Sequence, residues 1–215
     1  MAENVDLKAL DKKIFKTTNE DGLMDIYFGI LFMSLGIQAL FRDILPGVMG
    51  YLGIYLILIA FAFTFLIIGK KKITTPRMGI VKLSVKTSPT KKKLVITLSI
   101  NVVVSFIFFI LTFLDLFQFV QIDPIIFTLS IGLGIIALPI SLLAYFSKTP
   151  RWYIIAIVLG LGFFLTEIFY PVVGSPLDSL IAFSITGGSI IVMGLVVLSR
   201  FIKKYPLKNS EPINE

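Results

Sequence analysis

The chain has 215 residues, of which 56% are hydrophobic and 15% are charged, and its formal net charge is +7 at pH 7. A soluble domain has roughly 45–50% apolar and 25% charged residues, so the surplus of apolar residues indicates a membrane protein. Cysteine and histidine are both absent, which excludes disulfides, zinc sites built from Cys and His, and histidine proton relays. We expect no cofactor and no metal site.

Six apolar stretches are each long enough to cross a bilayer, which takes about 20 helical residues. The predicted spans are Leu23–Phe41, Gly47–Gly69, Leu94–Phe117, Pro124–Phe146, Arg151–Val173 and Leu177–Ile202. The predicted fold is therefore an all-α membrane protein with six transmembrane helices in three hairpins, residues 23–202. Residues 1–22 are expected to form a cytoplasmic amphipathic segment with a short interfacial helix, and residues 203–215 a cytoplasmic tail.

The basic residues avoid every second gap between these spans. All but one of the 20 Lys and Arg residues lie in the amino-terminal segment, in residues 70–93, at Lys148 and Arg151, or in the tail from Arg200. The exception is Arg42. The positive-inside rule then places both termini and the loop 70–93 in the cytoplasm. Topology and anionic lipid explain the positive charge, so no nucleic-acid partner is expected.

The loop 70–93 has an ordered-looking middle between two lysine triplets. Val81, Leu83 and Val85 alternate with polar residues, which is the period of a half-buried strand. We expect a short strand, paired in a hairpin with Ile73–Thr75 or with another copy of the chain. The basic residues of the loop either contact anionic lipid or dock a partner; they are Lys70, Lys71, Lys72, Arg77, Lys91, Lys92 and Lys93.

Two stretches carry a family resemblance. DGLMDIYFGILFMSLG, from Asp21 to Gly36, and TTPRMGIVKL, from Thr74 to Leu83, resemble elements of uncharacterised prokaryotic integral membrane proteins. The resemblance implies the cytoplasmic (inner) membrane of a prokaryote. It implies no activity and no site residues.

The third predicted span has a polar face. On a helix, its polar residues other than Ser99 fall within about 80° of arc, and polar side chains in a bilayer avoid lipid. This face is either the lining of a solute or ion path or a set of hydrogen bonds between helices. The residues proposed for a path are Asn101, Ser105, Thr112 and Asp115.

Glu167 is the one acid well inside a predicted span. It lies roughly 7–8 Å from the bilayer midplane, where an ionised carboxylate needs a partner, water or a proton. It shares a helix face with Ala156 and Gly160, so it can be buried against another helix. It either handles a proton or cation, or forms a structural hydrogen bond or an ion pair with Arg42.

Small residues form helix-packing stripes on two spans. The first span places Gly29 and Gly36 on one side together with Asp25. The fourth span has small residues within about 80° of arc, which lets two backbones approach closely. These residues of the fourth span are Ser130, Gly134, Ala137 and Ser141.

The sequence contains no phosphate-binding glycine loop and no nucleophile elbow, so an enzyme is not expected. The favoured role is a binding, scaffold or assembly protein of the cytoplasmic membrane, working through its cytoplasmic surface. The alternative is a small-solute or ion transporter or channel that uses the third-span polar face and Glu167. The expected partners are the bilayer, anionic lipid, and a second copy or another membrane protein.

Overall fold

The structure, a computed structural model, describes residues 19–41, 44, 48–78, 96, 99, 103 and 123–206. Its described secondary structure is helical throughout. Three long helices are α2 (Leu23–Leu40), α8 (Arg151–Val173) and α9 (Leu177–Lys204). A fourth helical segment begins with α3 (Val48–Gly69) and continues through the π-helical turn η1 (Lys70–Thr74) into α4 (Thr75–Met78). A fifth begins with α6 (Pro124–Ile131) and continues through the π-helical segment η3 (Gly132–Ala137) into α7 (Leu138–Ser147).

Five of these helical segments are long and apolar enough to cross a membrane. They fall on the first, second, fourth, fifth and sixth predicted spans, with ends within a few residues of the predicted ones except after Gly69. The third predicted span lies outside the described residues apart from Ile96, Ser99 and Val103. Its proposed path residues, Asn101, Ser105, Thr112 and Asp115, are therefore not described.

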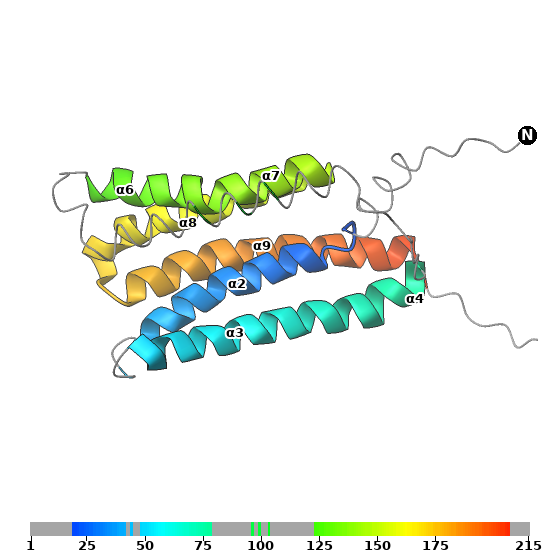
Figure 1. Ribbon diagram of the computed structural model, residues 1–215, viewed down its shortest axis with the longest axis horizontal. Coiled ribbons are helices and arrows are strands. Elements are labelled where there is room, and N and C mark those ends of the chain that lie inside the picture. Colours follow the sequence, from blue (N-terminus) through cyan, green and yellow to red (C-terminus); the bar gives the residue numbers. More distant parts are fainter. Residues whose placement is uncertain are drawn as a thin grey trace, which may run out of the picture.

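The helices lie side by side along the long axis of the molecule (Figure 1). α2 lies between α3 and α9, and α8 lies between α9 and the helix formed by α6, η3 and α7. The turn between α8 and α9 is short, from Gly174 to Pro176. α4 and the carboxyl end of α9 lie at one end of the bundle, and α6 begins at the other end (Figure 1).

Glycines bring α2 and α9 into backbone contact. A Cβ added to Gly29 would lie 2.6 Å from the carbonyl oxygen of Gly187, and one added to Gly187 would lie 2.6 Å from the oxygen of Gly29. Seven residues earlier on α2, Gly22 faces Gly194; seven residues later, Gly36 faces Leu180. Since the α9 numbers fall as the α2 numbers rise, the two helices are antiparallel. Small residues at such an interface replace side-chain packing with close backbone packing.

The contact between the fourth and fifth predicted spans uses a different glycine from the predicted one. Gly132 faces Gly160, and a Cβ on Gly132 would overlap the Gly160 carbonyl. Gly134 is exposed, with no atom of the described residues within 4 Å of an added Cβ. Ser130 is also exposed, Ser141 is half-buried and Ala137 is buried. The predicted small-residue stripe assumes the constant turn angle of a regular α-helix. Because η3 is π-helical and its turns are wider, the residues after η3 are rotated about the helix axis relative to those before it.

Aromatic side chains fill the middle of the interface between α2, α8 and α9. The rings of Phe32 and Phe183 pack edge to face with centroids 5.6 Å apart, and those of Phe163 and Phe183 with centroids 5.2 Å apart. Gly162 makes room for Phe32 and Thr186 beside it. This part of the bundle is an apolar core, since Phe32 and Phe183 are both buried and Phe163 packs against them.

The hairpin prediction at Ile73–Thr75 is wrong. The second span does not end at Gly69; its helix runs on through Lys70–Thr74 and Thr75–Met78. These backbone groups are used in helical hydrogen bonds, so they are not free to pair with a strand. The predicted strand residues Val81, Leu83 and Val85 lie outside the described residues.

Candidate functional site: an ionic hub at the start of α2

A cluster of buried charges joins the start of α2 to the end of α3 and the start of α8. We call it the ionic hub; its members are Asn19, Asp21, Asp25, Lys70, Thr74, Arg151 and Trp152. Asp21 and Asp25 are both 0% exposed, and Trp152 is 1% exposed. Carboxylates are rarely buried unless they are paired, so each needs its partners accounted for.

Asp21 connects α2 with the π-helical turn of η1. Its Oδ2 accepts hydrogen bonds from Lys70 Nζ at 2.7 Å and from Thr74 Oγ1 at 2.6 Å. Its Oδ1 accepts one from the backbone N–H of Leu23 at 3.1 Å, which satisfies a free donor at the start of α2. The carboxylate of Asp21 is therefore fully occupied by donors from its own chain.

Gly22 allows Asp21 to reach back to α2. It has φ +73°, a left-handed conformation that glycine adopts without strain. A Cβ at this position would also lie 2.5 Å from the carbonyl oxygen of Gly194. The Asp-Gly pair thus turns the chain into the helix while its backbone lies directly against α9.

Asp25 connects α2 with the first two residues of α8. Its Oδ1 accepts a hydrogen bond from Trp152 Nε1 at 2.8 Å. Its Oδ2 lies 2.9 Å from Arg151 Nε in an ion pair. Neither atom of that pair has a well-aligned hydrogen bond, so the contact is electrostatic rather than directional. Arg151 Nη2 also donates to the carbonyl of Asn19, so its guanidinium bridges two points on the entry to α2.

A weaker contact adds α9 to the hub. Lys204 Nζ lies 3.5 Å from Glu20 Oε2; the Lys204 side chain is 63% exposed and that of Glu20 34%. Such surface pairs contribute roughly 0–1 kcal/mol. The close packing of Gly22 on Gly194 is the firmer connection to α9 at this end.

The charges of the hub balance. Two buried carboxylates meet two cations, Lys70 and Arg151, whose side chains are 24% and 23% exposed. Removing one member of a buried pair leaves the other charge uncompensated, which costs about 3–5 kcal/mol. All carboxylate oxygens of the hub have partners, so the hub suits holding helix ends together better than binding a substrate. The described residues contain no group of three acidic side chains that could hold a metal ion.

Glu167 lies apart from the hub, on α8. It is half-buried and shares its face with buried Ala156 and Gly160. Within the described part of the chain, no hydrogen bond or ion pair is assigned to its carboxylate. Its predicted partner Arg42 lies outside the described residues.

The basic residues predicted to contact anionic lipid or to dock a partner lie in different surroundings. Lys70 belongs to the hub, whereas Lys71 and Lys72 are exposed on the next positions of η1. Arg77 is half-buried and donates from Nη1 to the carbonyl of Ile73 at 2.9 Å. Lys91, Lys92 and Lys93 lie outside the described residues.

The sequence predicts Lys70 only as a contact for anionic lipid or a partner, and Asp25 only as a neighbour of the packing glycines. It does not predict the roles of Asp21, Arg151 and Trp152. One signal was available: an acid at the third position of an apolar span needs a partner. The partners, however, come from other helices. Trp152 is 127 residues from Asp25, and Lys70 is 49 residues from Asp21.

Comparisons of this chain with protein families, curated proteins and solved structures gave no match. The function is therefore argued from the geometry of the hub and the distribution of charge.

Proposed function

We propose that this chain is a six-span protein of the cytoplasmic membrane of a prokaryote that acts as a binding, scaffold or assembly protein. The hub end of the bundle would be its cytoplasmic working face. The observation that carries the proposal is the hub itself, which uses its buried charges to fix the ends of α2, α3 and α8 against each other. A fixed platform at one end of a membrane bundle suits the docking of a partner.

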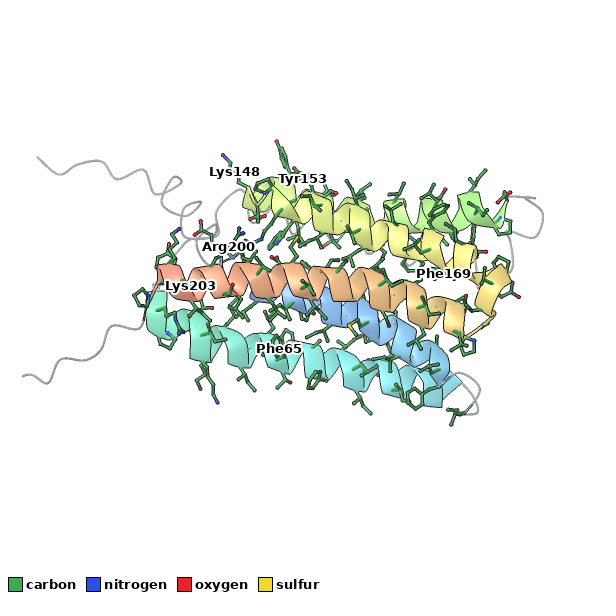
Figure 2. The ribbon with its side chains drawn as sticks, turned by 180° about the vertical axis from the view of Figure 1, so that it is seen from behind. Phe65, Lys148, Tyr153, Phe169, Arg200 and Lys203 are labelled. Atoms are coloured by element: carbon green, nitrogen blue, oxygen red, sulfur yellow. The ribbon has the colours of Figure 1, made fainter. Side chains whose placement is uncertain are left out.

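The distribution of charge supports the orientation. Every Lys and Arg among the described residues belongs to a helix end or turn on the hub side: Lys70, Lys71, Lys72, Arg77, Lys148, Arg151, Arg200, Lys203 and Lys204. Figure 2 shows Lys148, Arg200 and Lys203 at one end of the bundle and Phe169 towards the other. The acids Asp123 and Asp178 lie at the starts of α6 and α9, on the far side. Basic residues gather on the cytoplasmic side of membrane proteins.

The positions of two helix ends support the third predicted span, which would bring the number of crossings to six. α4 ends on the hub side of the bundle, whereas α6 begins on the opposite side (Figure 1). The chain therefore travels from one side to the other between Met78 and Asp123. The apolar stretch Leu94–Phe117 in this interval is long enough to make that crossing through a bilayer.

A crosslinking experiment tests the working face. A photoreactive residue replaces Lys72, which is exposed at the hub end, and in a matched variant it replaces Ile57, which is 68% exposed on α3. The proposal expects a discrete protein adduct, either a second copy or another membrane protein, from position 72 in the native membrane and lipid adducts alone from position 57. Equal protein adducts at both positions, or none at position 72, would count against a cytoplasmic working face.

The transporter or channel alternative keeps one observation in its favour. Glu167 is a half-buried carboxylate on a membrane-length helix, to which no partner is assigned within the described residues. If it carries a proton or cation, it would act together with the polar face of the third predicted span. The scaffold proposal instead treats Glu167 as an internal tie between helices.

Flux measurements separate these two functions. We expect purified protein in liposomes to show no flux above empty liposomes across a panel of cations and pH gradients. The transporter alternative predicts flux that Glu167→Gln abolishes, because Gln keeps the shape of the side chain and removes its titratable charge. Asp123→Asn is the matched control, since it removes an exposed acid at the far end. Flux lost only in Glu167→Gln would overturn the scaffold proposal.

A further inference from the structure

We infer that an exposed stripe on α9 binds one anionic phospholipid, with its phosphate on Arg200 and Lys203 and an acyl chain along Val192 and Val196. The inference rests on the membrane placement in the proposed function, and it adds a defined lipid site to it. None of its four residues belongs to the basic loop 70–93.

The four side chains share one face of α9. Their spacings of four, four and three residues keep them within about 80° of arc on an α-helix. Val192 and Val196 are 62% and 44% exposed, and Arg200 and Lys203 are exposed as well. The other side of α9 carries the buried residues Ile190, Gly194 and Phe201, which pack in the bundle. The stripe is therefore the outer face of a helix whose inner face is already used.

The charges of the stripe differ from those of the hub in their surroundings among the described residues. At the hub end, Lys70, Arg151 and Lys204 pair with Asp21, Asp25 and Glu20. No acidic partner is assigned to Arg200 or Lys203 within the described residues. A cation in the last turn of a helix is favourable by itself, which accounts for Lys203 in part. Arg200 lies one turn earlier, so this effect of the helix end does not account for its position.

The arrangement fits a lipid better than a soluble anion. At 1.5 Å per residue, Val196 lies about 6 Å and Val192 about 12 Å below Arg200 towards the bundle centre. This is the order of a headgroup followed by an acyl chain. Arg binds phosphate with two parallel hydrogen bonds, and the stems of Arg and Lys lie along apolar surface while their charges reach the headgroup. An inorganic phosphate or an acidic protein segment would leave the valines uncovered.

Lipid binding to purified protein tests the site. The affinity for phosphatidylglycerol and phosphatidylcholine is measured by native mass spectrometry in a neutral detergent for wild type, R200Q/K203Q and K71Q/K72Q. Both variants remove two exposed charges from the same end of the bundle. A juxtamembrane base contributes on the order of a five-fold gain in binding to anionic lipid, so R200Q/K203Q is expected to lose about thirty-fold for phosphatidylglycerol. K71Q/K72Q is expected to keep its affinity to within about three-fold.

Several outcomes overturn the inference. Equal losses in the two variants would show diffuse attraction to the whole basic end. Equal binding of the two lipids by wild type, or unchanged binding by R200Q/K203Q, would exclude the site. Displacement of the lipid by inorganic phosphate at matched concentration would show a site for free phosphate, and displacement by an acidic peptide a site for a protein segment.

Two further measurements distinguish a failure of the lipid site from a failure of the proposed function and from misfolding of a variant. Trp152 is the only tryptophan and lies in the hub, so its emission reports whether each variant keeps the wild-type fold. The single variants R200Q and K71Q give the same comparison with one charge removed. If wild-type protein shows no preference for phosphatidylglycerol while the crosslink at position 72 is retained, this inference alone fails. If that crosslink is absent, the proposed working face fails.

Discussion

The two carboxylate oxygens of Asp25 contact neighbouring residues of α8: one accepts a hydrogen bond from an indole, and the other pairs with a guanidinium. The indole N–H of Trp152 is a directional donor at 2.8 Å, and Arg151 supplies the opposite charge at 2.9 Å. Because Asp25 is fully buried, the pair is little screened, and its desolvation is offset only while both partners remain. This residue therefore sets the position of α8 against α2 at the hub end.

Replacing Asp25 by Asn tests this role. The amide can still accept from Trp152, but Arg151 loses its counter-charge, so we expect the free energy of unfolding to fall by about 3 kcal/mol. Unfolding is followed through the emission of Trp152, which should also shift. Asp123→Asn is the control: Asp123 is exposed and caps α6 through the N–H of Ile125, a role that Asn also fills, so its effect should stay within about 0.5 kcal/mol. Equal effects of the two substitutions would contradict a structural role for the hub charge.

The ionic partners of the hub could not be predicted from the sequence. Spacing rules identify neighbours on one helix, because positions three and four apart share a face. Arg151 and Lys70 instead meet the start of α2 through the packing order of the bundle, which periodicity does not encode. The sequence predicts that Lys70 contacts anionic lipid or a partner, whereas in the structure Lys70 pairs with Asp21.

At the scale of the element, the main interface is the antiparallel pair of α2 and α9. Its glycines recur every seven residues on both helices, which is two turns, so each lies at the same contact line. The pattern on α2, with Gly29 and Gly36 on one side, was visible in the sequence. Its partner line on α9, Gly187 and Gly194, was not singled out, because α9 also carries Gly188 and several other small residues.

The adjacent glycines Gly187 and Gly188 provide a matched test of this interface. A Cβ at Gly187 would lie 2.6 Å from the backbone oxygen of Gly29, whereas a Cβ at Gly188 has no atom of the described residues within 4 Å. We expect Gly187→Ala to lower the free energy of unfolding by about 1–3 kcal/mol, because backbone cannot move aside cheaply. Gly188→Ala should be neutral or stabilising by up to about 1 kcal/mol, through helix propensity. The free energy of unfolding in mixed micelles measures both; if Gly187→Ala proves neutral, the helices do not touch as described.

The fourth predicted span shows why face predictions can be displaced. Its boundaries, Pro124 to Phe146, agree with the observed helix to within one residue. The side that contacts α8 is nevertheless marked by Gly132 and not by Gly134. The projection uses a fixed angle per residue, and the π-helical segment Gly132–Ala137 breaks that angle. Hydrophobic length determines where a span begins and ends, but not which backbone turns it contains.

At the scale of the whole molecule, composition and the lengths of the apolar stretches correctly predict the helical class and the helices at five of the six predicted spans. These properties depend on the amount of apolar surface, which a sequence states directly. The third predicted span, Leu94–Phe117, and the cytoplasmic placement of the termini are proposals, supported by the charge distribution and by the opposite positions of the ends of α4 and α6 (Figure 1).

Accessibility of single cysteines tests the central claim, that the chain is a membrane bundle with its hub end in the cytoplasm. The chain contains no cysteine, so one residue can be probed at a time. Ser175 is exposed in the turn between α8 and α9, and Lys72 is exposed at the hub end. With a membrane-impermeant thiol reagent, Ser175→Cys should be labelled in intact cells, and Lys72→Cys only after the membrane is permeabilised. Labelling of Lys72→Cys in intact cells, or of both variants equally, would contradict the proposed placement.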